Sequence, residues 1–121
     1  MGLDIWFDKE VYTTSDTKYF RKVNFLVDYF NLENCNSHIC TYDELTTLVD
    51  KCKLVLEARS EEVSKRELPC CEGFFFGEYE YNDGYYDDVK SVMDAVQELI
   101  ASLETDNKLN VHSRIIVNAW W

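Results

Sequence analysis

The apolar positions of this chain follow two periods, which predict strands at its ends and helices between them. Near the C-terminus, apolar and polar residues alternate over positions 111–121. A period of two over this length predicts a strand with one buried face, on which Val111, Ser113, Ile115, Val117, Ala119 and Trp121 lie. The run 3–7 is rich in β-branched and aromatic residues and predicts a second strand. We expect the two strands to pair antiparallel.

Three segments repeat their apolar residues at intervals of three and four, which predicts three helices. The first spans 16–30 and carries the apolar stripe Phe20, Val23, Val27 and Phe30. The second begins with a capping box at Thr41–Glu44 and buries Leu45, Leu48, Val49, Cys52, Val55 and Leu56. The third spans 86–103 and buries Val89, Val92, Met93, Val96, Leu99, Ile100 and Leu103.

The remaining segments are predicted to connect these elements. Residues 8–16 form a polar turn and residues 31–38 a loop, and the charged stretch 59–66 is either a solvated helix end or a loop. With 121 residues, the chain suits one compact domain over 1–121. The predicted fold class is therefore α+β, with three helices packed on a small antiparallel sheet that includes the N- and C-terminal strands.

Segment 72–88 is the most unusual part of the chain, because seven of its seventeen residues are aromatic and six are acidic. Tyrosine offers rigid contact area and a hydroxyl, which favours interfaces. On the third predicted helix, Asp87, Asp94 and Glu98 fall along one outward stripe. We therefore predict a partner-binding surface made of Glu78, Tyr79, Glu80, Tyr81, Asp83, Tyr85, Tyr86, Asp87, Asp94 and Glu98.

Two other interpretations of this segment stay open. The tyrosines could pack over the sheet and leave only their hydroxyls in water. Alternatively, residues 74–86 could form the aromatic wall of a pocket that sequesters a small molecule or a nucleotide.

The formal net charge of −11 constrains the partner. A nucleic-acid binder needs the opposite field, so we do not expect direct binding to DNA or RNA. Such a charge can steer a basic partner or simply keep the protein solvated. No segment approaches the roughly 20 apolar residues of a membrane span, and the first residues do not follow a signal-peptide pattern. The expected location is the cytoplasm, where the five cysteines would stay reduced.

Metal and catalytic chemistry were weighed against ordinary structural roles. Cys35, His38 and Cys40 lie within six residues, but their spacing is at the edge of the zinc pattern, which favours ordinary thiols. Neither His38 nor His112 lies in a nucleophile motif. The carboxylates of 78–88 lack calcium-loop spacing and are interpreted as a solvated acidic face rather than as an acid–base pair. We expect no enzyme activity, no cofactor and no metal.

Four pieces of the chain together resemble a group of small phage- and prophage-encoded proteins. They are Met1-Gly2-Leu3-Asp4; Tyr19-Phe20-Arg21-Lys22-Val23-Asn24; Gly73-Phe74-Phe75-Phe76-Gly77 with Tyr85-Tyr86-Asp87-Asp88; and the terminal Trp121. The resemblance supplies no catalytic residue and no cofactor. It implies a small protein made from a mobile element inside a bacterial host cell.

By analogy, small acidic phage proteins often block host defence systems, including CRISPR effectors, sometimes by imitating nucleic acid. The expected function is thus a non-enzymatic inhibitor that binds a host protein with a basic surface. Exposure of Trp120 or Trp121 would also be compatible with a homodimer.

Overall fold

The computed structural model describes residues 2–10, 14–33, 35–70, 80–110 and 112–120. Along the chain the elements are β1 (Asp4–Glu10), β2 (Thr14–Arg21), α1 (Phe25–Tyr29), β3 (Ser37–Cys40), α2 (Tyr42–Ala58), α3 (Glu61–Glu67), α4 (Asp83–Lys108) and β4 (Arg114–Trp120). The strands form one antiparallel sheet in the order β2-β1-β4-β3. The α+β class and the antiparallel pairing of the terminal strands are confirmed.

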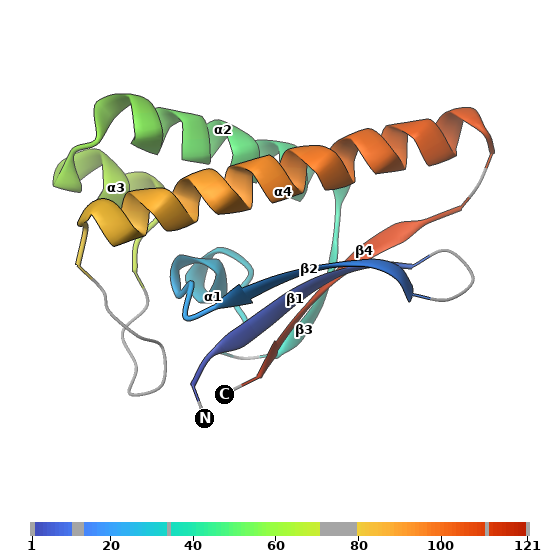
Figure 1. Cartoon of the computed structure of the whole chain (residues 1–121), viewed down its shortest axis with the longest axis horizontal. Coiled ribbons are helices and arrows are strands. Elements are labelled where there is room, and N and C mark those ends of the chain that lie inside the picture. The colour runs from blue at the N-terminus through green and yellow to red at the C-terminus, as the bar shows by residue number, and fades with distance from the viewer. Residues whose placement is uncertain (1, 11–13, 34, 71–79, 111, 121) are drawn as a thin grey trace.

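The helices cover one face of the sheet (Figure 1). Helices α2 and α4 run side by side in the outer layer, and the short α1 lies between that layer and one end of the sheet. The alternation predicted for the last strand is confirmed over β4, because Ile115, Val117 and Ala119 point into the core while Trp120 is exposed, and Val111 and Trp121 lie outside the described residues. The opposite face of the sheet carries no helix in the described part of the chain.

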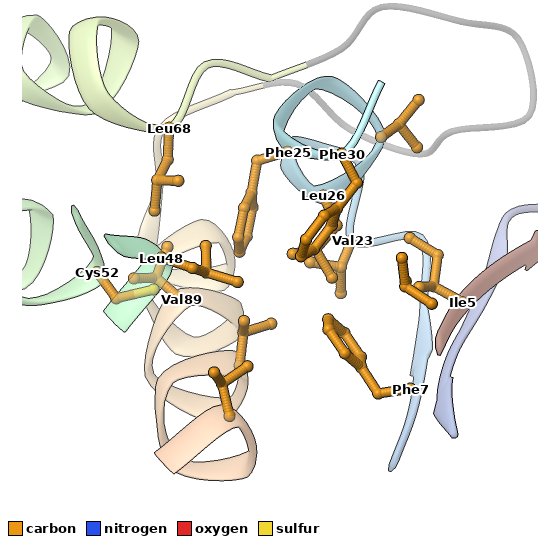
Figure 2. Packing of buried hydrophobic residues seen from close by; sticks show 14 of the residues in the cluster. Ile5, Phe7, Val23, Phe25, Leu26, Phe30, Leu48, Cys52, Leu68 and Val89 are labelled. Carbon is orange, nitrogen blue, oxygen red and sulfur yellow. The ribbon is translucent and has the colours of Figure 1, made fainter. Parts of the chain in front are cut away.

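The core forms where α1 is enclosed between the sheet and the two long helices. Figure 2 shows α1 residues lying between Phe7 of β1 and the side chains of α2 and α4. The ring of Phe7 contacts the rings of Phe20 and Phe30, at centroid distances of 6.1 and 5.8 Å. Phe7 is fully buried, and burying such a side chain contributes about 1.5–3 kcal/mol. The rigid framework of the molecule is therefore the sheet, α1 and the α2–α4 pair.

The predicted helix over 16–30 is wrong in its first half. Residues Thr14–Arg21 form β2, which pairs with β1 along its length. Lys22 then adopts a left-handed conformation with φ of 58°, and α1 begins only at Phe25. Threonine and aromatic side chains favour strands, and pairing with β1 overrides the apolar spacing that suggested a helix.

Other boundaries also differ from the predictions. Strand β1 continues to Glu10 within the predicted turn, and β3 begins at Ser37 within the predicted loop. The charged stretch after α2 forms a separate helix, α3, because Arg59 ends α2 with φ of 44° and the Ser60 side chain caps the next helix. The structure thus has four helices in its described residues, where three were predicted.

The two long helices begin at capping side chains. The capping box of α2 is confirmed, since the Thr41 hydroxyl accepts from the Glu44 amide and the Glu44 carboxylate accepts from the Thr41 amide. Helix α4 begins at Asp83, three residues earlier than predicted, because the Asn82 side chain accepts from the Tyr85 amide. This early start brings residues 83–86 into the first turn of α4.

Candidate functional site

Exposed carboxylates follow the outer surfaces of α2 and α4. We call this set of six the acidic helical face: Asp43, Asp50 and Glu57 of α2 with Asp87, Asp94 and Glu98 of α4. Along α2 the carboxylates recur every seven residues, which corresponds to about 10 Å along a helix axis. The buried residues of both helices face the sheet, so these carboxylates project from the opposite sides of the helices, and only Glu98 among them reaches a strand through its described contacts.

Two members of the acidic helical face form ion pairs with lysines. Lys90 Nζ lies 2.8 Å from Asp94 Oδ1, one turn away on α4. Lys18 Nζ of β2 lies 2.6 Å from Glu98 Oε2. Both pairs are solvent-exposed and therefore contribute little to stability. Among the described residues, Asp43, Asp50, Glu57 and Asp87 form no ion pair, so much of the negative charge remains uncompensated.

Tyr85 and Tyr86 of the predicted binding surface have structural roles instead. Tyr85 and Tyr86 are each only 6% exposed, so the expectation that their rings face outward does not hold. The Tyr85 hydroxyl donates to the Leu68 carbonyl oxygen at 2.7 Å, and the Tyr86 hydroxyl lies 3.2 Å from the Ser64 hydroxyl. Burial of Tyr85 raises its pKa far above the ordinary value. These residues attach α3 and its C-terminal end to the first turn of α4.

The other predicted surface residues fall into three groups. Tyr81 is half-buried, and its hydroxyl accepts from the Cys70 amide at 3.1 Å. Glu80 and Asp83 are exposed. Glu78 and Tyr79 lie outside the described residues. The acidic half of the predicted surface is therefore exposed where it is described, whereas the aromatic half contributes to packing.

A pocket of about 380 Å³ lies between two separate stretches of the chain. One wall comes from the end of β2 and the start of α1, with the described lining residues Arg21, Lys22, Asn24 and Phe25. The other wall comes from the segment around the first turn of α4, with Glu80, Asn82, Gly84, Tyr85 and Asp88. Cys70 completes the described lining. We call this cavity the α1–α4 pocket.

Two of the four pieces that carry the phage-protein resemblance line this pocket, and the N-terminal piece contacts one of them. The Lys22 amide donates to the Leu3 carbonyl oxygen at 2.7 Å, which places the N-terminal piece beside the second piece. Gly2 has φ of 122°, and a Cβ there would lie 3.3 Å from Cε of Lys22, so a side chain would be both strained and crowded. The third piece contributes Tyr85 and Asp88 from α4. Segments distant in sequence thus form one local structure.

The electrostatics of the α1–α4 pocket are uneven. Burial raises the pKa of Asp88 above the ordinary value, and the neighbouring Asp87 carboxylate raises it further. Phe25 and Tyr85 form an edge-to-face ring pair with centroids 5.7 Å apart and give the pocket an apolar floor. Glu80 and Asp88 bring two carboxylates into one cavity, which is the convergence that an acid–base hydrolase would need. We interpret them as binding groups because the opposite wall carries Arg21 and Lys22.

The fold separates Cys35, His38 and Cys40, whose spacing lies at the edge of the zinc pattern. Cys40 is buried and Cys35 is exposed, while both Oε atoms of Glu44 lie within 2.9 Å of Nε2 of His38. No group of three or more metal-ligating side chains gathers in the described ranges. Burial raises the pKa of the Cys40 and Cys52 thiols to about 12, so neither supplies a thiolate near neutral pH.

Sequence reasoning noted exposure of Trp120 but did not predict that it belongs to an apolar surface on the open face of the sheet. Trp6 packs against Tyr19 on the neighbouring strand, with ring centroids 5.6 Å apart. Tyr19, Ile39 and Trp120 are 52, 55 and 68% exposed. The register pairs Ile39 with Ile116, so apolar side chains extend across all four strands. The alternation over 114–120 indicated this face, but the apolar residues of the other three strands could not be placed beside Trp120 from the sequence.

Polar side chains between these apolar residues form cross-strand hydrogen bonds. Tyr19 donates to Asp4 at 2.6 Å. The Asn118 side chain donates to Asp8 at 2.9 Å and accepts from Ser37 at 2.8 Å. We call the surface formed by Trp6, Tyr19, Ile39, Ile116 and Trp120 the open sheet face.

Comparisons with known proteins add no relative: no protein-family model, no curated protein and no solved structure matches this chain. Among the residues that the structure describes, no helix is both long and apolar enough to cross a bilayer.

Proposed function

We propose that this protein is a non-enzymatic, phage-type binding protein that docks through its acidic helical face onto a basic surface of a bacterial host protein. The observation that carries the proposal is the exposure of Asp43, Asp50, Glu57 and Asp87 without ion-pair partners among the described residues, on one side of the molecule. Helix α4 alone carries seven carboxylates and two lysines. Such a field speeds encounter with a basic partner and repels nucleic acid.

The spacing of the carboxylates suggests the kind of basic surface. Charges repeated along two adjacent helices offer a partner a rigid row of anions, as a nucleic-acid backbone does. A protein groove that binds phosphates through lysine and arginine would accept such a row. A nucleic-acid-handling defence effector, such as a CRISPR complex, is the partner class that combines this chemistry with the phage resemblance. Occupying its groove would inhibit it by mimicry, from within the cytoplasm of the host cell.

The test compares two variants that carry the same charge change at different places. In Asp87→Lys/Asp94→Lys, the net charge changes from −11 to −7, because each substitution adds two positive units on the acidic helical face. In Asp28→Lys/Glu62→Lys, the same change is made at exposed positions on α1 and α3. Each protein is immobilised, exposed to bacterial lysate at about 0.05 and 0.5 M NaCl, and the captured proteins are identified by mass spectrometry.

We expect wild type and the α1/α3 variant to capture the same nucleic-acid-binding protein at low salt, and double-stranded DNA to displace it. The α4 variant should lose it. If both double variants retain the protein equally, or if capture survives both high salt and DNA, the electrostatic docking mechanism is refuted.

A homodimer is a second proposal, favoured by the open sheet face. Trp120 is 68% exposed beside other apolar side chains. Among the outward strand positions whose side chains are described, Asp4 and Asp8 are matched in sign by Arg21 and Arg114, so charge repulsion between two copies is weaker here than at the acidic helical face. Light scattering coupled to size exclusion should give a dimer mass for wild type and a monomer mass for Trp120→Ser. A monomeric wild type at about 100 μM would exclude this dimer.

A further inference from the structure

We propose that the α1–α4 pocket binds a small zwitterion of the amino-acid type, with its carboxylate held at the Arg21–Lys22 wall and its ammonium held at Asp88. This inference does not depend on the docking function, because the pocket lies beneath the start of α4 rather than on the acidic helical face. It rests on the separation of opposite charges across one cavity, on the size of that cavity and on its apolar floor.

The cationic wall is unusual for this protein. Acidic residues outnumber basic ones by 23 to 12, so most basic side chains could be expected to find a carboxylate. In the described residues, however, neither Arg21 nor Lys22 forms an ion pair, although both line the same cavity. Two adjacent cations at a pocket wall supply the charge and the donors that a carboxylate prefers.

The opposite wall supplies the complementary charge. Asp88 is half-buried and lines the pocket, and it forms no ion pair with any described residue. A carboxylate removed from water is costly unless a partner compensates it. Burial and the neighbouring Asp87 carboxylate raise the pKa of Asp88, and no cation of the described chain forms an ion pair with it. An ammonium group of a bound ligand would supply this missing cationic partner of Asp88.

The size and the floor of the pocket restrict the ligand further. Its volume of about 380 Å³ is near the lower end of ordinary ligand sites, which favours a small metabolite over a nucleotide. The phosphates of a nucleotide would be drawn to the Arg21–Lys22 wall and would leave the Asp88 carboxylate without a cation. The edge-to-face pair of Phe25 and Tyr85 gives apolar contact area for an aliphatic or aromatic side chain. A zwitterion with an apolar side chain fits these three properties together.

The experiment follows the backbone amide of Gly84, a pocket-lining residue, by two-dimensional NMR of the full chain. The probes are the twenty amino acids, tested singly at up to about 10 mM. The strongest binder is then compared with its N-acetyl derivative, which lacks the ammonium, and with its methyl ester, which lacks the carboxylate. Inorganic phosphate and adenosine monophosphate test a purely anionic ligand.

We expect at least one amino acid to shift the Gly84 resonance in a saturable manner, and both derivatives to bind at least about tenfold more weakly. The proposal is overturned if none of the twenty shifts this resonance, if either derivative binds within about twofold of the parent, or if phosphate or the nucleotide binds more tightly.

Matched variants test whether Lys22 holds the carboxylate of the ligand and Asp88 holds its ammonium. Lys22→Met and Asp88→Asn should each weaken binding about tenfold, whereas Lys53→Met and Glu62→Gln, which remove exposed charges outside the described pocket lining, should change it less than about twofold. In wild type, affinity should fall as the pH decreases through the raised pKa of Asp88, because protonation removes the partner of the ammonium. This pH profile tests the proposal even if a variant does not fold, and an affinity that is constant between pH 7 and pH 4 would refute it.

Discussion

The hydroxyl of Tyr85 donates a hydrogen bond of 2.7 Å to the backbone carbonyl oxygen of Leu68. Both residues are almost fully buried, at 6 and 1% exposure. The bond joins the first turn of α4 to the residue that ends α3. It therefore identifies Tyr85 as a residue that holds two helices together rather than one that contacts a partner.

Replacing Tyr85 with phenylalanine should lower the free energy of unfolding by about 1–2 kcal/mol, because the buried Leu68 carbonyl loses its donor while the ring stays in place. Urea unfolding followed by circular dichroism measures the change. Tyr19→Phe is the matched control, since it removes a hydroxyl that bonds an exposed Asp4 carboxylate. The control should cost less than about 0.5 kcal/mol, and equal costs in the two variants would contradict the assignment.

The Glu44 carboxylate should stabilise the fold above its pKa and lose this effect in acid. Burial opposes its ionisation, but hydrogen bonds from the Thr41 amide and from His38 outweigh that effect and lower the pKa of Glu44 below the ordinary value. A lowered folded-state pKa adds stability that is present above the unfolded-state pKa and disappears as the pH falls through the folded-state pKa.

Glu44→Gln should therefore be less stable than wild type by about 0.5–1 kcal/mol near pH 6, and the difference should shrink below about pH 4. Thermal unfolding from pH 3 to pH 7 measures it. Glu57→Gln controls for the loss of one negative charge on the same helix. A difference between wild type and Glu44→Gln that is constant with pH would contradict the prediction.

The thiols should react with iodoacetamide in an order set by their environments. Cys35 is exposed, whereas burial raises the pKa of Cys40 and Cys52 to about 12. Native protein at pH 8 should be alkylated at Cys35 at least about a hundredfold faster than at Cys40 or Cys52, because only the thiolate reacts. Peptide mass spectrometry gives the rates, and denatured protein should show them equalised. Rapid labelling of Cys52 in the native state would contradict its placement in the core.

The rate at which the protein associates with its docking partner should depend on the salt concentration. Raising NaCl from about 0.05 to 0.5 M should slow wild-type association at least about tenfold. At the higher salt concentration, attraction between exposed charges is screened within a few ångströms. Asp87→Lys/Asp94→Lys should start from a slower rate and show a weaker salt dependence. Surface plasmon resonance with the captured protein separates association from dissociation, and a change confined to dissociation would count against electrostatic steering.

The terminal strands and the two long helices could be predicted because their local patterns agree with their tertiary environments. In β4 the alternation survives as buried Ile115 and Val117, and in α2 the capping box starts an apolar stripe that stays buried. The segment 16–30 misled because Phe20, Val23 and Val27 fit a helical stripe, yet the chain turns at Lys22. The strand over Thr14–Arg21 is explained only by the pairing of β2 with β1, and the local sequence pattern does not contain this pairing.

A candidate site could be predicted from the sequence only where its residues lie close together along the chain. A carboxylate stripe on one helix, such as Asp87 and Asp94, follows from spacing alone. Whether Tyr85 faces solvent depends on Leu68, which lies on another element, and this information is absent from the local sequence. The α1–α4 pocket required two distant walls to be brought together, so sequence reasoning could name an aromatic wall but not the Arg21–Lys22 wall opposite it.

The position of β4 between β1 and β3 determines when the protein can fold during its synthesis. Asp4 pairs with Trp120, so the centre of the sheet joins opposite ends of the sequence. While a ribosome still encloses β4, the emerging chain can form the β1–β2 hairpin and its helices, but β3 has no strand beside it and one edge of β1 stays unpaired. Completion of the sheet must therefore wait until β4 has left the ribosome, and until then the nascent chain exposes an aggregation-prone edge.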